Sequence, residues 1–288
     1  MSGQEYLPTP FATHPPNMEL PLLTPTTTRG FLDGLNVRPR KNLGQNFLVE
    51  PNLVRKSLRM AQVGEGETVV EIGPGLGTLT RGLLNAGAEV HAVEQDPAMV
   101  RHLEADLVPR RGNQLLLLEG DALKQPRANL PAGKAVKVVA NLPYAITTPW
   151  LETILADPLP TRMVLLMQKE AAQRVMADPG TKAFGPISIF VQSAFQLADQ
   201  HRVSPRCFHP VPEVDSALIR LDLRPDAYLF TQEQRTIIRS IFTRRRKQLK
   251  PMCAKHGLLE WFTNIAAREL PETVRPEQVP AQLWQQIG

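Results

Sequence analysis

Residues 68–77 read Thr-Val-Val-Glu-Ile-Gly-Pro-Gly-Leu-Gly, and this stretch decides the fold. Its apolar half predicts a buried strand that ends at Ile72, and its three glycines allow a sharp turn into a helix over residues 76–86. Such a turn lets a ligand approach the backbone closely at the start of a helix. The spacing is Gly-x-Gly-x-Gly rather than the Gly-x-Gly-x-x-Gly of dinucleotide-binding folds. The stretch therefore predicts a nucleotide-like cofactor at the carboxyl end of a strand.

Strands and helices alternate outward from this stretch. Strands are expected at residues 68–72, 89–94, 114–119, 134–140, 162–167 and 216–223, with helices at 76–86, 97–107, 149–156 and 169–177. Most of these strands are continuous runs of Val, Leu or Ile, which is typical of strands covered on both faces. Thr148 before Pro149 predicts a helix start. The alternation predicts an α/β fold, an open and mostly parallel sheet with helices on both faces.

The two ends of the chain differ from this central part. Six prolines and six threonines fall within the first 28 residues, without apolar periodicity, so residues 1–36 are expected to form a disordered tail. After about residue 224 the strand pattern stops, and helices are expected over 231–249, 258–270 and 276–287. The predicted organisation is a tail (1–36), an α/β domain (37–224) and a small helical domain (225–288).

Composition excludes several classes of protein. The chain has 288 residues, of which 42% are hydrophobic and 21% charged, as in globular proteins. No apolar run reaches the ~20 residues of a membrane span, and the N-terminus does not resemble a secretory leader. Two cysteines cannot build a disulfide scaffold or a Cys-rich zinc site. We expect a cytoplasmic protein without membrane association and without a metal.

Positive charge is concentrated in one segment. The net charge is +5, and residues 235–256 carry eight Lys or Arg side chains and no acid. Such a segment indicates a surface for a polyanion, although a charged run is often only a solvated face. One side chain does not fit: Arg245 would project into the apolar side of the helix expected over 231–249. Either the helix ends before it or its guanidinium meets a partner.

Carboxylates mark the ends of the next two strands. Glu94 ends the second strand, where a carboxylate can accept hydrogen bonds from both hydroxyls of a ribose. Asp121 follows the third strand and can accept from an adenine amino group. The glycine stretch lacks the lysine of a triphosphate site. A loop ringed by Glu71, Glu94 and Asp121 instead suits a cationic sulfonium, which favours S-adenosylmethionine as the cofactor.

The fourth strand ends in Asn141-Leu142-Pro143-Tyr144. The Asn141 side-chain oxygen and a backbone carbonyl can accept the two hydrogens of an exocyclic amine, and the Tyr144 ring can stack on a purine. The alternative interpretation is a structural turn with a packed tyrosine.

Five motifs together resemble those of the KsgA/RsmA family of small-subunit ribosomal RNA adenine dimethyltransferases. They are residues 40–48 (Arg-Lys-Asn-Leu-Gly-Gln-Asn-Phe-Leu), 71–77, 141–144, 166–170 (Leu-Met-Gln-Lys-Glu) and 208–216 (Phe-His-Pro-Val-Pro-Glu-Val-Asp-Ser). The resemblance covers roughly residues 38–250 and implies a Rossmann-like class I methyltransferase sheet. One departure is Ala145, where the family usually has Asn.

The resemblance also implies roles for individual residues. It places S-adenosylmethionine, and its product S-adenosylhomocysteine, against Asn46, Leu48, Gly73, Glu94, Asp121 and Asn141. It places the target adenine against Asn141, Leu142, Pro143 and Tyr144, with Phe208 closing on its other face. The implied substrate is two adjacent adenosines, methylated twice on N6, in the 3′-terminal hairpin of 16S ribosomal RNA within an assembling 30S subunit. RNA would contact Arg244, Arg245, Arg246 and Lys247, and the enzyme would act as a monomer.

Two alternatives stay open. The antibiotic-resistance methyltransferases that act on 23S RNA share the glycine loop and an Asn-x-Pro-Tyr motif, although residues 45–48 and 208–216 favour the small-subunit enzyme. A relative that has become a non-catalytic assembly or transcription factor belongs to a different class. The complete Asn141–Tyr144 motif argues against such a loss of activity.

Overall fold

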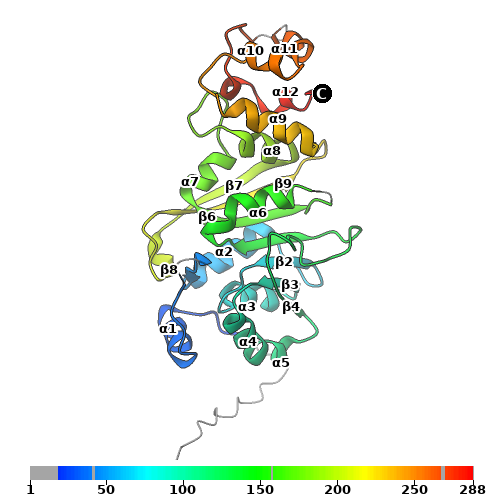
Figure 1. Ribbon diagram of the computed structural model, residues 1–288. Coiled ribbons are helices and arrows are strands. Elements are labelled where there is room, and N and C mark those ends of the chain that lie inside the picture. The colour runs from blue at the N-terminus through cyan, green and yellow to red at the C-terminus, as the bar shows by residue number, and fades with distance from the viewer. Residues whose placement is uncertain (1–18, 41–42, 157, 267–269, 288) are drawn as a thin grey trace, which may run out of the picture.

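The computed structural model describes residues 19–40, 43–156, 158–266 and 270–287. At its centre lies a seven-stranded sheet in the order β4-β3-β2-β5-β6-β9-β7 (Figure 1). Its strands are β2 (Thr68–Ile72), β3 (Glu89–Glu94), β4 (Leu115–Glu119), β5 (Lys137–Asn141), β6 (Arg162–Gln168), β7 (Phe195–Val203) and β9 (Ser216–Leu223). Neighbours from β4 to β6 pair in parallel, whereas β9 is antiparallel to both β6 and β7. The mostly parallel sheet that the sequence predicts is therefore present.

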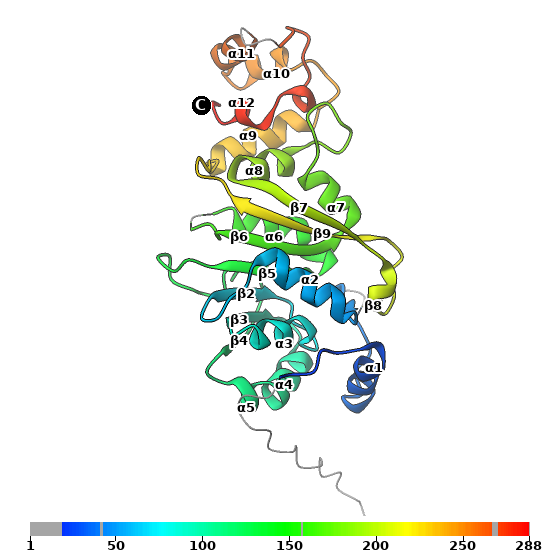
Figure 2. The ribbon, with the colours of Figure 1, turned by 180° about the vertical axis from the view of Figure 1, so that it is seen from behind.

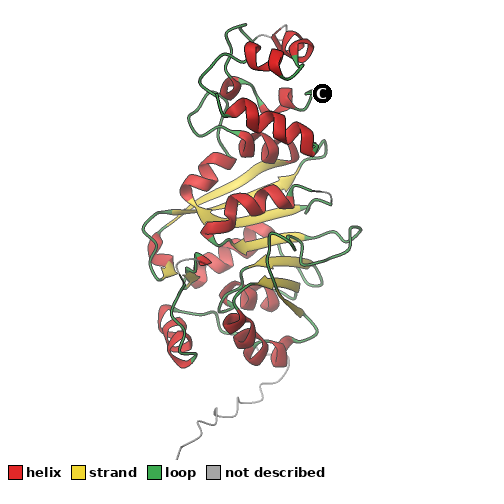
Figure 3. Cartoon of the chain, viewed as in Figure 1, coloured by secondary structure: helices red, strands yellow, loops and turns green. Residues whose placement is uncertain are grey.

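Helices cover both faces of this sheet (Figures 2 and 3). They are α2 (Pro51–Ala61), α3 (Thr78–Asn85), α4 (Pro97–Asp106), α5 (Val108–Arg111), α6 (Thr147–Ile154), α7 (Lys169–Val175) and α8 (Pro186–Ala194). Successive strand residues point to opposite faces. Accordingly, Val69 packs in the hydrophobic cluster with α2, α3 and α4, whereas Val70 packs in the cluster with α6, α7 and α8. Each apolar run thus contributes to two cores.

The C-terminal region is helical, as predicted. It contains α9 (Gln232–Phe242), α10 (Lys250–Lys255), α11 (Leu259–Ala266), a 3-10 turn over Pro276–Gln278 and α12 (Ala281–Trp284). The rings of Trp261 and Trp284 pack against each other in this region, with centroids 5.0 Å apart and planes tilted by 37°. Its buried residues belong to the same cluster as the α6–α8 face of the sheet. The division into separate domains near residue 224 stays a prediction.

The expectation of a disordered tail is wrong for residues 19–36. Helix α1 (Pro25–Gly34) begins after Thr24, whose side chain accepts a hydrogen bond from the Thr27 amide. Leu20, Leu23 and Leu32 of this region are buried, so it has a core-facing side. Thr24 before Pro25 is a cap followed by a proline at the first helical position, a start signal that the count of prolines and threonines obscures. Residues 1–18 lie outside the described residues.

Other boundaries also differ from the sequence prediction. Helix α6 starts at Thr147 rather than after a Thr148 cap, because a 3-10 turn over Tyr144–Ile146 leads directly into it. The long helix expected over 231–249 ends at Phe242. The sequence prediction also omits α2, α8, β7 and a small sheet of β1 (Phe47–Leu48) with β8 (Phe208–His209). None of the helices in the described ranges has the length and apolar character needed to cross a bilayer.

Candidate active site

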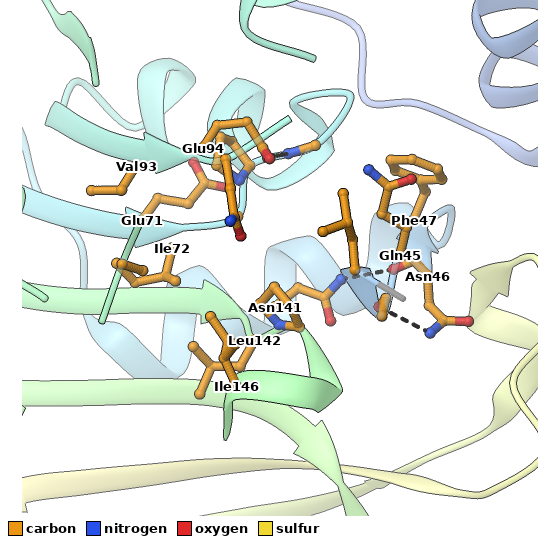
Figure 4. Close-up of a pocket in the computed structure, with 18 of the residues that line it drawn as sticks. Gln45, Asn46, Phe47, Glu71, Ile72, Val93, Glu94, Asn141, Leu142 and Ile146 are labelled. Carbon is orange, nitrogen blue, oxygen red and sulfur yellow. Dashed lines mark hydrogen bonds between the residues drawn. The ribbon is translucent and has the colours of Figure 1, made fainter. Parts of the chain in front are cut away.

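A cavity lies at the carboxyl ends of β2, β3 and β5 (Figure 4). Together with the open solvent at its mouth, it contains about 1010 Å³ of space. Its lining comes from residues 43–48, 71–76, 78–79, 93–95, 120, 122 and 141–146. Ligand sites of open α/β sheets form at this edge. The predicted cofactor loop and the predicted Asn141–Tyr144 motif therefore share one cavity.

The glycine loop works mainly by allowing close approach. Gly73 and Gly75 have φ of +67° and +57°, in the left-handed region that favours glycine. A Cβ on Gly73 would lie 3.0 Å from the Pro143 ring, and one on Gly75 would lie 3.0 Å from the Phe47 ring. The amides of Gly73 and Gly75 already donate to Val93 O and to Glu94 Oε2. The loop thus packs closely against Pro143, Phe47 and Glu94, which belong to three different segments of the cavity lining.

Glu94 lines the cavity at the end of β3, as the ribose assignment requires. Its Oε2 accepts from the Gly75 amide at 3.0 Å, and its Oε1 accepts from the Asp96 amide at 2.8 Å. Burial to 8% exposure raises its pKa, and the backbone amides oppose that shift. Each carboxylate oxygen can accept a further hydrogen bond, because it has two lone pairs. The amides therefore hold the carboxylate in place without using up its capacity.

Glu71 is the second carboxylate of the cavity. It lies near the end of β2 and is 1% exposed, and its Oε2 has no hydrogen-bond partner among the described residues. Burial raises its pKa to about 8, and the nearby charge of Glu94 adds to the shift. The Thr80 hydroxyl and amide act in the opposite direction without offsetting burial. Two carboxyl groups in one buried space favour a ligand that carries positive charge.

The structure places the third predicted acid at the rim. Asp121 is half-buried and does not itself line the cavity, although its neighbours Gly120 and Ala122 do. Its Oδ1 accepts from the Leu123 amide at 2.9 Å, which fixes the turn after β4. The adenine contact assigned to Asp121 stays a prediction.

Residues 43–48 form the wall opposite the glycine loop, and both predicted contacts, Asn46 and Leu48, line the cavity. The Asn46 carbonyl accepts from Asn141 Nδ2 at 3.0 Å, and the Leu48 carbonyl accepts from Thr78 Oγ1 at 2.9 Å. β1 anchors the segment to β8 through the pairs Phe47–His209 and Leu48–Phe208. Residues 43–48, although far in sequence from Asn141, are thus held at the carboxyl end of β5.

The Asn141–Tyr144 corner is held from several sides. Because Asn141 Nδ2 donates to the Asn46 carbonyl, the side-chain oxygen Oδ1 remains available as an acceptor (Figure 4). The Leu142 amide donates to Leu166 O at 2.9 Å on the neighbouring strand. Tyr144 Oη lies 2.7 Å from Ser216 Oγ at the start of β9. All four residues of the motif line the cavity.

Phe208 does not reach the cavity. Its side chain is 2% exposed and packs in the hydrophobic cluster that contains Leu48 and Leu53. Its backbone pairs with Leu48 in the β1–β8 sheet. In this structure Phe208 anchors the wall formed by residues 43–48, and the contact of its ring with the target base stays a prediction.

Sequence reasoning missed two supporting residues, Asp96 and Ser216. Gln45 Nε2 donates to Asp96 Oδ2 at 2.8 Å, which ties the wall to the turn after Glu94. Asp96 also caps α4, because its Oδ1 accepts from the Ala98 amide at 3.0 Å. Asp96 before Pro97 is a helix-start signal that would have placed its carboxylate here. Ser216, the Tyr144 partner, gives no comparable signal, because only the sheet pairing brings it near.

The basic segment divides into two groups. Arg245 follows the end of α9, and its guanidinium donates to the carbonyls of Lys182 and Thr181 at 2.8 and 3.1 Å. The sequence left two alternatives for Arg245, that the helix ends before it or that its guanidinium has a partner, and both are true. Arg235 likewise donates to backbone carbonyls of residues 152 and 155. By contrast, the exposed cations of the predicted RNA surface are Arg244, Arg246 and Lys247.

Comparison with known proteins identifies the family. Residues 36–282 match the family described as "Ribosomal RNA adenine dimethylase". The chain belongs to this family. A protein of Opitutus terrae named "Ribosomal RNA small subunit methyltransferase A" is 52% identical over 92% of this chain and 98% of its own. One of the same name from Phenylobacterium zucineum is 39% identical over 90% of each chain.

Solved structures agree on the fold. A dimethyladenosine transferase from Plasmodium falciparum superposes with a TM-score of 0.68 and 24% identity over 83% of this chain and 94% of its own. The 23S rRNA methyltransferase ErmE superposes with a TM-score of 0.66 and 22% identity over 83% of this chain and 96% of its own. The Rossmann-like methyltransferase fold is thereby confirmed. The family membership makes the chain a methyltransferase that acts on adenines of ribosomal RNA, in a family that depends on S-adenosylmethionine.

Proposed function

We propose that this enzyme transfers methyl groups from S-adenosylmethionine to the N6 amines of two adjacent adenosines in the 3′-terminal hairpin of 16S ribosomal RNA. The substrate is the assembling 30S subunit, and the enzyme acts as a monomer in the cytoplasm. The observation that carries the proposal is the hydrogen bond from Asn141 Nδ2 to the Asn46 carbonyl, which leaves Oδ1 at the cavity as an acceptor. The family relatives named for the small subunit support the choice of RNA.

The residues of the cavity fit the cofactor. Glu94 can hold ribose hydroxyls, the glycine loop allows Pro143 and Phe47 to pack closely against it, and Glu71 adds a second carboxyl group beside a cation. When bound, S-adenosylmethionine supplies a methyl group on a positively charged sulfur, which is a good leaving group. Asn46, Leu48, Gly73, Asp121 and Asn141 complete the proposed set of contacts.

The corner residues prepare the nucleophile. The lone pair of an adenine amine is delocalised into the ring, so the free amine attacks poorly. Asn141 Oδ1 and the Leu142 carbonyl accept its two hydrogens, which favours a pyramidal nitrogen with its lone pair directed at the donor. Tyr144, held by Ser216, stacks on the base. Positioning of this kind can supply roughly 7–11 kcal/mol, and the alkylated amine then loses its proton to solvent without a dedicated base.

RNA binding is assigned to the exposed cations of the C-terminal region. Arg244, Arg246 and Lys247 project from the segment after α9, where they can neutralise phosphates. Arg245 is the exception within the proposed surface, since its guanidinium is bound to backbone carbonyls. The target bases must leave their stack to enter the corner.

A transfer assay tests the proposal. Unmethylated 30S and 50S particles are incubated with the protein and methyl-labelled S-adenosylmethionine, and labelled positions are mapped. We expect two adjacent dimethylated adenosines near the 3′ end of 16S RNA, and no transfer by Asn141→Ala. Arg101→Ala, an exposed cation on α4 away from the cavity, is the matched control. Label confined to 23S RNA would refute the proposed substrate.

A further inference from the structure

Glu71 lines the cofactor cavity but takes no part in the proposed methyl-transfer step. Glu71 lines the cavity and is 1% exposed, and its Oε2 has no hydrogen-bond partner among the described residues. Native proteins rarely leave a buried carboxylate oxygen without a donor, because the desolvation penalty is large. A buried carboxyl group that lines a cavity and has one oxygen without a partner indicates a group that can receive a ligand.

The surroundings of Glu71 supply no positive charge. Glu94, at the end of β3, is a second carboxyl group near Glu71, and Thr80 of α3 offers it a neutral hydroxyl. Arg81, the next residue on α3, turns to a buried ion pair with Asp106. On the β5 side the polar group at the cavity is the Asn141 amide. Among the described residues that line the cavity there is no cation, and the Thr80 hydroxyl and amide favour the charged form of Glu71 only weakly compared with the effect of burial.

Burial and the absence of a neighbouring cation favour the neutral form of Glu71 in the free protein. Burial and the neighbouring Glu94 raise the pKa of Glu71 to about 8, so that near neutral pH it carries a proton. A cation placed in the same cavity favours the ionised form and drives the proton off. S-adenosylmethionine and S-adenosylhomocysteine differ by one positive charge, which lies on the sulfur. The two ligands must therefore act differently on a carboxyl group that lies beside them.

We propose that Glu71 is a proton-linked charge sensor: it is neutral in the free protein, releases its proton to solvent when the cationic methyl donor binds, and thereby favours the donor over its uncharged-sulfur product. This inference rests on the proposed cofactor. After transfer the sulfur is neutral, so Glu71 takes a proton back from solvent and the product loses that attraction. Glu71 is thus a specificity-determining residue that promotes exchange of product for donor.

Titration calorimetry of the full chain tests the sensor. S-adenosylmethionine and S-adenosylhomocysteine are each titrated at pH 7 in buffers of different ionisation enthalpy, which gives the number of protons released. We expect about 0.9 proton more for wild type than for Glu71→Gln with the donor, and a smaller difference with the product. Glu104→Gln, an exposed acid on α4, should behave as wild type. Equal proton release by wild type and Glu71→Gln would overturn the inference.

A second measurement follows the preference for donor over product across pH. The amino group of each ligand also titrates, and the sulfonium charge gives it different pKa values in donor and product, so Glu71→Gln is measured alongside wild type to supply the contribution of the ligands themselves. For wild type relative to Glu71→Gln we expect the preference for donor over product to rise between pH 6 and pH 8, by up to about 50-fold if product binding leaves the pKa of Glu71 unchanged. A relative preference that does not change over this range would refute the sensor. If neither ligand binds at all, the proposed cofactor fails instead, which is a distinct outcome.

Discussion

Two neighbouring arginines should respond in opposite ways to the same substitution. The Arg245 guanidinium donates to the carbonyls of Lys182 and Thr181 at 2.8 and 3.1 Å, and its side chain is 31% exposed. Arg246, one residue further, is exposed. Arg245→Ala removes two hydrogen bonds from a charged donor, each worth ~1.5–3 kcal/mol. Because the site is partly solvated, we expect the free energy of unfolding to fall by roughly 2–3 kcal/mol.

Arg246→Ala should change that free energy by less than about 0.5 kcal/mol, as is usual for surface positions. Its effect should appear in RNA binding instead. Loss of one phosphate contact reduces the slope of log affinity against log salt by about 0.9, whereas Arg245→Ala should leave that slope unchanged.

Urea unfolding and filter binding at several salt concentrations measure the two quantities for both variants. The assignment of Arg245 to stability and of Arg246 to RNA binding would be refuted by one result. In that result Arg245→Ala is as stable as wild type and reduces the salt dependence of RNA affinity as much as Arg246→Ala does.

Three other substitutions test the site. The pKa of Glu71 is raised from 4.5 to about 8, so its proton stabilises the fold fully below pH 4.5, and this contribution is lost as pH rises through 8. The thermal stability of Glu71→Gln should match that of wild type near pH 4 and exceed it above pH 8, by at most about 5 kcal/mol. Gly44 has φ +63° and a Cβ there would lie 3.2 Å from the Tyr144 amide, so Gly44→Ala should cost about 1–2 kcal/mol and lower kcat, and an unchanged kcat would contradict the close approach. Glu94→Ala should abolish methylation and leave RNA affinity within about twofold in a filter-binding assay, since Glu94 lies in the cofactor cavity away from the exposed cations; methylation at the wild-type rate would exclude the ribose contact.

Much of the sheet could be predicted because its strands are apolar on both faces. Val69 and Val70 are both buried, on opposite sides, and such runs stand out in any sequence. β7 was missed for the opposite reason. It is an edge strand in which only the two end residues, Phe195 and Val203, are buried, so it lacks an apolar pattern. Its place is set by pairing with β9, which lies beyond local sequence.

The site shows the same division between local and tertiary information. Glu94 and Asn141 follow from their positions at strand ends, because parallel strands bring their carboxyl ends to one edge. The packing of Phe208 does not follow from local sequence, because the β1–β8 pairing decides where the ring lies. Arg245 is similar: its charge suggested RNA, and only the folded chain brings the carbonyls of Thr181 and Lys182 to it.

A crystal structure of the protein with S-adenosylhomocysteine tests the central claim most directly. We expect the ribose hydroxyls within hydrogen-bond distance of Glu94, the adenine beside Gly120 and Ala122, the amino-acid part at Gly73, and the sulfur facing Asn141 across the cavity. Binding of the ligand outside the edge formed by β2, β3 and β5, or with its sulfur turned away from the Asn141–Tyr144 corner, would contradict the account.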